Sequence, residues 1–138
     1  MSDRIEQEIA QGKTISDNAE SVWRWSTPTG KIRAERRSKY FIELGKINKG
    51  SKVLELGCGT GIFTKMVHDA TNASLIAIDI SDDLLNQAVK KIPYVQFKVE
   101  DAMQTSFADA TFDCVFGSSV IHHLDLEKSA KEIFRVLK

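Results

Sequence analysis

The chain from Lys52 onward alternates short β-rich runs with runs of helical periodicity, and this alternation restricts the fold more than any other feature. The β-rich runs cover residues 53–56, 75–78, 95–99 and 112–116, with helical runs at 62–70, 81–92 and from 125. Because a helix that joins two parallel strands must cross over the sheet, this order predicts an α/β fold with a parallel sheet between two helical layers. Ligands bind at the carboxyl ends of such strands, so each strand end is a candidate site.

The overall composition excludes several protein classes. The 138 residues, 42% of them hydrophobic and 28% charged, suit one globular domain rather than a disordered or fibrous chain. Two cysteines cannot build a disulfide framework, which favours a reducing compartment. No apolar run approaches the ~18 residues of a membrane-spanning helix, and the first residues lack the apolar core of a secretory signal. We therefore expect a cytoplasmic protein that does not contact membranes.

Residues 1–45 lack the alternation of the part that follows, and residues 1–52 carry 11 Lys and Arg against 7 Asp and Glu. We expect them to form an N-terminal helical extension or lid, and residues 46–138 to form the ligand-binding domain. A run at 31–45 has helical periodicity, and Lys and Arg concentrate at 31–39. Because the net charge of the whole chain is zero, we interpret the basic run as a solvated helix face, with a polyanion-binding patch as the alternative.

Helical wheels predict which sides of two helices are apolar. In the 31–45 helix the apolar side consists of Ala34, Tyr40, Phe41 and Leu44. Arg33 and Arg37 fall inside or at the edge of that arc. In the last helix the apolar side consists of Leu126, Ala130, Ile133, Phe134 and Leu137.

The first strand runs into a glycine-rich loop, Glu55–Gly61, and a helix follows. Gly57, Gly59 and Gly61 permit a tight turn and close approach of a ligand to the backbone, and the helix N-terminus offers free N–H groups to an anion. The dinucleotide fingerprint G-x-G-x-x-G requires glycine where Ile62 stands, and no P-loop Lys follows. Taken alone, the loop is equally consistent with a glycine-rich turn that binds nothing.

Two acidic residues follow the second and third strands. Asp79 could accept hydrogen bonds from the vicinal hydroxyls of a ribose, or Asp79 or Ser81 could simply cap the next helix. Asp101 could accept a hydrogen bond from an adenine amino group while the Ala102 N–H donates to the ring. The alternative is that Asp101 is an ordinary surface acid.

The fourth strand runs into Gly117 and Ser118, which let the chain pass close to a ligand, and then into His122 and His123. Either imidazole could act as a general base, because an unperturbed histidine titrates near pH ~6.5. The alternative is that one ring is packed and the other solvated. Adjacent histidines rarely share one ion, and His68 lies on a helix that runs away from this edge, so we expect no metal site.

Five motifs occur together in a fixed order. They are VLELGCGTG at 53–61, the acid of IAIDIS at 79, VEDA at 99–102, FDCVFGSSVIHHL at 112–124 and EIFRVLK at 132–138. In this order they resemble the motifs of class I S-adenosylmethionine-dependent methyltransferases, most of all the small-molecule enzymes related to ubiquinone and menaquinone biosynthesis. The resemblance implies a Rossmann-like three-layer α/β/α sandwich with strand order 3-2-1-4, and S-adenosyl-L-methionine as the cofactor.

The resemblance also implies a role in cofactor binding for a set of matching positions. These are Glu55, Gly57, Cys58, Gly59, Gly61, Asp79, Ile80, Asp101, Ala102, Gly117 and Ser118. The glycine loop would pass under the methionine and ribose, Glu55 would hold the amino group through water, and Ile80 would pack on the adenine. Gly117 and Ser118 would line the methionine end. Arg33 or Arg37 could meet the cofactor carboxylate or form an internal ion pair.

These residues predict methyl transfer to oxygen or carbon of a small-molecule acceptor. The reaction needs no acid, and a base such as His122 or His123 is required only where the acceptor loses a proton. The alternatives are a non-catalytic module that binds S-adenosylmethionine or S-adenosylhomocysteine, an RNA methyltransferase, and an NAD-dependent dehydrogenase. Ile62 and the Asp101–Ala102 pair argue against NAD, and the zero net charge argues against nucleic acid.

Relatives normally continue beyond the motif that ends at Lys138, with about three more strands. We therefore expect a truncated sheet in which the fourth strand is an exposed edge. Two copies of the chain could pair through that edge as a homodimer.

Overall fold

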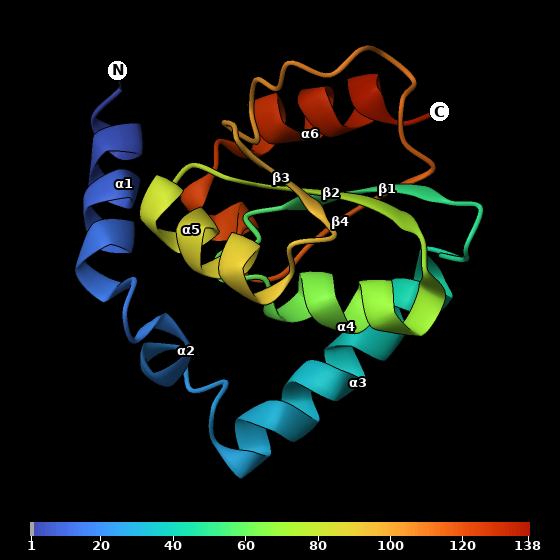
Figure 1. Ribbon diagram of the computed structural model, residues 1–138. Coiled ribbons are helices and arrows are strands. Elements are labelled where there is room, and N and C mark those ends of the chain that lie inside the picture. The colour runs from blue at the N-terminus through green and yellow to red at the C-terminus, as the bar shows by residue number, and fades with distance from the viewer. Residues whose placement is uncertain (1) are drawn as a thin grey trace.

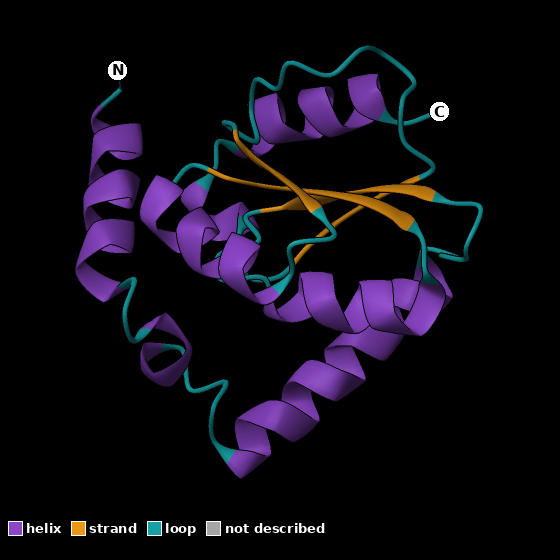
Figure 2. Cartoon of the chain, in the orientation of Figure 1, coloured by secondary structure: helices purple, strands orange, loops and turns teal. Residues whose placement is uncertain are grey.

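The computed structural model describes residues 2–138 and contains three helical segments before the sheet: α1 (Asp3–Ile15), α2 (Ala19–Val22) and α3 (Pro28–Leu44). The strands are β1 (Lys52–Leu56), β2 (Ser74–Asp79), β3 (Gln96–Val99) and β4 (Cys114–Gly117). Between and after them lie α4 (Ile62–Thr71), α5 (Asp82–Lys91), the 3₁₀ turn η1 (Ile121–His123) and α6 (Leu126–Val136) (Figures 1 and 2). Among these described segments, no helix has the length and apolarity that crossing a bilayer requires.

The four strands form one parallel sheet in the order β3-β2-β1-β4. The central strand β1 places Leu54 opposite Ile76 of β2 and Val115 of β4. Helix α6 covers one face of the sheet, and α4 and α5 cover the other (Figure 1). The predicted α/β class, strand order and layer arrangement are therefore confirmed.

Alternate side chains of β1 enter two separate cores, as the period of two in a strand requires. Val53 packs with Phe63 and Val67 on the α4 side, and Leu54 packs with Phe112 and Val136 on the α6 side. Because both faces of the sheet are covered, the sequence of β1 is a nearly continuous apolar run. The exception is Glu55, which is buried among the apolar residues.

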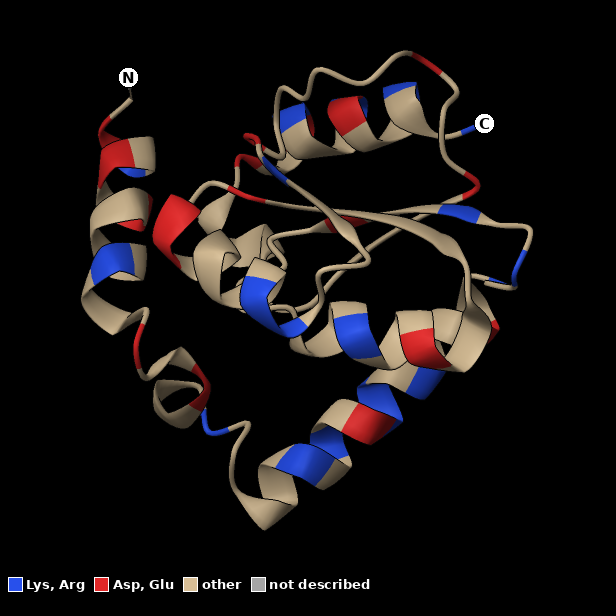
Figure 3. Cartoon of the chain, viewed as in Figure 1, with Lys and Arg blue, Asp and Glu red and all other residues tan. Residues whose placement is uncertain are grey.

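Helix α3 packs against α4 through small residues, which corrects part of the predicted buried side. Ala34 and Ser38 are buried and Phe41 is partly buried, whereas Tyr40 is 54% exposed and Leu44 is 83% exposed. Small residues spaced four apart let the two helix backbones approach closely, so the larger side chains turn outward. Lys and Arg are frequent along α3 (Figure 3), and Lys31, Arg36 and Lys39 are exposed, as a solvated face requires.

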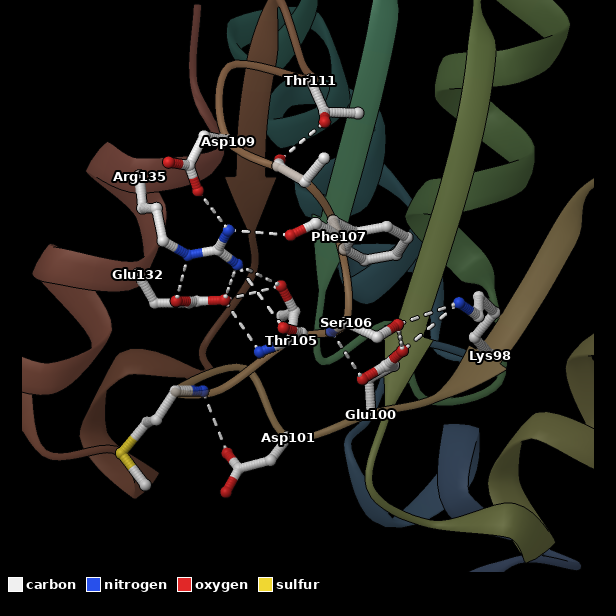
Figure 4. A network of polar contacts seen from close by, with 12 residues as sticks. Lys98, Glu100, Asp101, Thr105, Ser106, Phe107, Asp109, Thr111, Glu132 and Arg135 are labelled. Carbon is white, nitrogen blue, oxygen red and sulfur yellow. Dashed lines mark hydrogen bonds and ion pairs between the residues drawn. The ribbon is translucent and has the colours of Figure 1, made fainter.

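Helix α6 is also rotated from the predicted orientation. Leu126 is 68% exposed, Phe134 is 84% exposed and Ala130 is exposed, whereas Ser129 and Val136 are buried. The physical reason is a polar network that turns the other side of the helix inward (Figure 4).

In that network the Arg135 guanidinium donates to Glu132, to Asp109 and to the carbonyl oxygen of Phe107. The Glu132 carboxylate also accepts from the backbone N–H and the hydroxyl of Thr105, at 2.8 and 2.6 Å. These contacts fasten the loop between β3 and β4 to α6 and lower the pKa of Glu132 to about 2, chiefly through the Arg135 hydrogen bond. A helical wheel, which considers only the residues of the helix itself, cannot predict such polar contacts with a distant loop.

Candidate functional site

A cavity of about 500 Å³ opens at the carboxyl edge of the sheet. The loops after all four strands line it, together with residues of α1, α3 and the segment that precedes α3. The predicted site residues in its wall are Gly57, Cys58, Gly59, Asp79, Ile80, Asp101, Ala102, Ser118, His122 and His123. Segments separated by more than 60 residues in the sequence thus converge on one space.

The glycine loop needs glycine for both conformation and space. Gly57 and Gly59 have φ values of 61° and 55°, in the left-handed region that L side chains rarely adopt. A Cβ on Gly57 would lie 2.5 Å from Cγ2 of Val120, and one on Gly59 would lie 2.9 Å from Cη2 of Trp23. The loop is therefore closely packed by neighbours from the segment after β4 and from the N-terminal segment.

Asp79 ends β2 and ties the glycine loop to the start of α5. Its carboxylate accepts from the Gly59 N–H at 2.8 Å and from the Ser81 N–H at 2.9 Å. Desolvation raises the pKa of Asp79, and the two N–H donors oppose that shift. Helix α5 is capped by Ser81, whose hydroxyl accepts a hydrogen bond from the Leu84 N–H at 3.3 Å. Each Asp79 oxygen keeps acceptor capacity for a hydroxyl donor.

At the end of β3, Asp101 is bound by a residue from the far N-terminus. Arg4 of α1 donates to the Asp101 carboxylate at 2.9 Å and to Glu8 at 2.7 Å. The other Asp101 oxygen accepts from the Met103 N–H at 3.0 Å, which shapes the turn after β3. Arg4 has no motif around it, so sequence reasoning missed it. Asp101 is half-buried rather than an ordinary surface acid.

Three predicted residues do not line the cavity. Gly61 precedes α4, where a Cβ would lie 2.8 Å from Ile92, and Gly117 leaves room for Val120 and the Leu56 carbonyl. Glu55 lies beneath the glycine loop, 1% exposed, and its carboxylate accepts from the Thr64 hydroxyl. Desolvation raises the pKa of Glu55 to about 8.

The loop after β4 carries the two histidines and contacts α3. The ring centroids of His122 and His123 lie 3.9 Å apart with the ring planes tilted by 42°, and both residues are exposed. Arg37 donates to the Ser118 hydroxyl at 2.6 Å and to the Ser119 hydroxyl at 3.2 Å. These hydrogen bonds join α3 to the end of β4.

Trp25 anchors the basic side of the cavity. Its ring meets Phe63 edge to face with centroids 5.4 Å apart, and the guanidinium carbons of Arg33 and Arg37 lie 5.0 and 5.3 Å from its centroid. Within residues 2–138, neither arginine reaches a carboxylate at ion-pair distance, so the predicted internal ion pair is wrong. Arg33 lines the cavity, whereas Arg37 stands behind it. Trp23 and Trp25 belong to no sequence motif, so sequence reasoning missed their place at the cavity.

Comparisons with known proteins identify the family of the chain. The family model of a methyltransferase domain matches residues 53–138. An uncharacterised methyltransferase-like protein of Schizosaccharomyces pombe is 36% identical over 92 residues, which cover 67% of this chain and 36% of that protein. The demethylmenaquinone methyltransferase of Lactobacillus johnsonii is 36% identical over 113 residues, which cover 74% of this chain and 45% of that enzyme.

A solved structure has the same fold. A protein of Pyrococcus horikoshii superimposes with a TM-score of 0.71 at 32% identity, covering 83% of this chain and 53% of that one. The chain spans about a third of the length of three curated relatives that it matches.

Proposed function

The chain belongs to the methyltransferase domain family, and from that premise we propose that it binds S-adenosyl-L-methionine in the strand-end cavity and transfers the methyl group to a small-molecule acceptor. The observation that carries this proposal is the convergence of the strand-end residues on one cavity, where Gly57 and Gly59 meet Asp79 and Asp101. A relative named demethylmenaquinone methyltransferase supports a small acceptor.

The adenosine would lie over the ends of β2 and β3. Asp79 would accept from the ribose hydroxyls with the acceptor capacity that its two backbone bonds leave free. Ile80 would pack on the adenine, and Asp101 and Ala102 would bind its edge. Arg4 fixes the Asp101 carboxylate in position for that contact.

The methionine would lie over the glycine loop and the start of α4. Gly61 gives α4 no side-chain cap, and Ile62 and Phe63 of its first turn line the cavity. Free N–H groups and the positive end of the helix dipole there suit a carboxylate. Glu55, just beneath the loop, would reach the amino group through water.

The transfer itself is an in-line displacement at the methyl carbon. The protein contributes mainly alignment of acceptor, methyl and sulfur, which can supply ~7–11 kcal/mol of the barrier reduction. For a hydroxyl or acidic carbon acceptor, His122 or His123 would remove the proton. Both imidazoles line the cavity and are open to solvent, which gives the proton an exit.

Calorimetric titration with S-adenosylhomocysteine tests the cofactor site. We expect saturable one-to-one binding to the native chain, at least tenfold weaker binding to Asp79→Ala, and unchanged binding to Asp82→Ala, whose carboxylate is exposed on α5. Thermal unfolding of each variant separates lost contacts from lost fold. A folded native chain that does not bind the product refutes the proposal, and binding without transfer to any acceptor favours the non-catalytic module.

Three finer predictions accompany this function. A cytoplasmic location follows from cysteine usage, and a homodimer would form through the β4 edge. Weak or absent nucleic-acid binding follows from the zero net charge. Each remains a prediction, and sedimentation analysis of the purified chain, alone and with RNA, addresses the second and third.

A further inference from the structure

Charged groups around the cavity are segregated across the sheet. The acidic residues of the wall lie on α1 and at the ends of β2 and β3, and they are Glu8, Asp79, Glu100 and Asp101. On the side of β1 and β4 the wall carries Arg33, His122 and His123, with Arg37 directly behind. Since the strand order is β3-β2-β1-β4, the acidic groups occupy one half of the cavity edge and the basic groups the other.

Three of the four acidic groups are paired with cations within the chain, and Asp79 accepts from two backbone N–H groups instead. Arg4 pairs with both Asp101 and Glu8, and Lys98 lies 3.3 Å from the Glu100 carboxylate. Arg33 has no such partner among the described residues, as noted above. The basic half therefore holds a cation whose counter-charge the described part of the chain does not supply.

The position of Arg33 is defined even without a counter-ion. Its guanidinium lies over the Trp25 ring, and that ring is held by the edge-to-face contact with Phe63. A guanidinium that stacks on an aromatic face keeps its N–H donors in the plane, where they match the two oxygens of a carboxylate or phosphate. The stack fixes the group before any ligand arrives, so less side-chain entropy is lost on binding.

Bound cofactor would not neutralise this half of the cavity. S-adenosylmethionine carries a sulfonium and an ammonium against a single carboxylate, and the uncapped N-terminus of α4 can receive that carboxylate. The sulfonium would bring a further positive charge to the cavity. A neutral, apolar acceptor would leave the Arg33 guanidinium without a charged partner.

We infer that the methyl acceptor is a small acid whose carboxylate or phosphate binds the Arg33 guanidinium beside Trp25. This inference rests on the proposed function and names its substrate class. In the transfer, an O–H or C–H proton of the acceptor moves to His122 or His123, and the released electron pair forms the new bond to the methyl carbon. The S–CH₃ bond breaks with its electrons on sulfur, which leaves neutral thioether.

The test uses the chain saturated with S-adenosylhomocysteine and three probes that share one ring: benzoate, phenyl phosphate and benzamide. We expect at least one acid to bind in calorimetric titration and the neutral amide to bind at least tenfold more weakly. Comparison of benzoate with phenyl phosphate distinguishes a carboxylate from a phosphate acceptor. The variant Arg33→Gln should weaken the acid at least tenfold and leave the affinity for S-adenosylhomocysteine unchanged.

The matched control is Arg36→Gln, because Arg36 is exposed on the same helix and outside the cavity. It should change neither affinity. Equal binding of benzamide and the acids, or no binding of either acid, overturns the inference. A loss of S-adenosylhomocysteine affinity in Arg33→Gln with acid binding intact assigns Arg33 to the cofactor and also overturns it. Failure of the native chain to bind S-adenosylhomocysteine refutes the proposed function itself.

Discussion

The buried carboxyl of Glu55 makes the stability of the protein depend on pH in an unusual direction. Its pKa is raised from 4.5 to about 8, because desolvation outweighs the hydrogen bond from Thr64. The folded state therefore keeps a proton that the unfolded chain releases between those two values. The contribution of Glu55 to the free energy of unfolding is fully present at low pH. It is lost as the pH rises from about 4.5 towards about 8.

The magnitude follows from the size of the shift. With 1.36 kcal/mol per pKa unit, raising the pH from about 5 to about 8 lowers the free energy of unfolding by about 3 kcal/mol through this one group. Glutamine has the shape of the protonated acid and still accepts from Thr64. Glu55→Gln should therefore match the native protein near pH 5 and exceed its stability by about 3 kcal/mol near pH 8.

Urea unfolding of both proteins at several pH values measures the difference directly. Glu132, whose pKa is lowered to about 2, acts only below this range in both proteins. The control is Glu127→Gln, because the Glu127 side chain is 77% exposed. Parallel curves for the native and Glu55→Gln proteins would show that Glu55 is ionised in its buried position and would refute the reasoning.

Two further substitution pairs test the loop and the helix orientation. Gly59→Ala must place a side chain at a φ of 55° and against Trp23, so we expect a loss of roughly 1–2 kcal/mol and weaker S-adenosylhomocysteine binding. Gly50→Ala should change neither, because its Cβ would meet only the exposed Asn48 side chain, at 3.3 Å. On α6, Val136→Ala should cost about 2 kcal/mol in urea unfolding, and Phe134→Ala less than ~0.5 kcal/mol, because their exposures are 1% and 84%. Equal losses within either pair would contradict the packing described here.

The sheet and the strand ends were predictable because they depend on local patterns. The runs around Leu54 and Ile76 are apolar and short, and the glycines after β1 occur where the chain must turn back. Once the strands are parallel, topology alone brings Asp79 and Asp101 to one edge of the sheet. Ten of the predicted site residues line the cavity for this reason.

The helix orientations were harder to predict because a wheel counts only apolar residues. Helix α3 turns Ala34 and Ser38 inward and leaves the larger Leu44 exposed, because close packing of the helix backbone sets its orientation. Helix α6 turns Glu132 and Arg135 towards the loop that they bind. In both cases the deciding partner lies far away in the sequence, where periodicity carries no information.

The N-terminal segment shows why the cavity could not be derived from the motif region alone. Arg4 reaches Asp101 across 97 positions of sequence, Trp23 packs on Gly59, and Trp25 holds the guanidinium of Arg33. None of these three residues belongs to a motif, yet each contacts a motif residue or carries a charge at the cavity. The strand-end loops supply the groups suited to a cofactor, which the family shares. The segment before them supplies the groups that distinguish one acceptor from another, so specificity is best sought there.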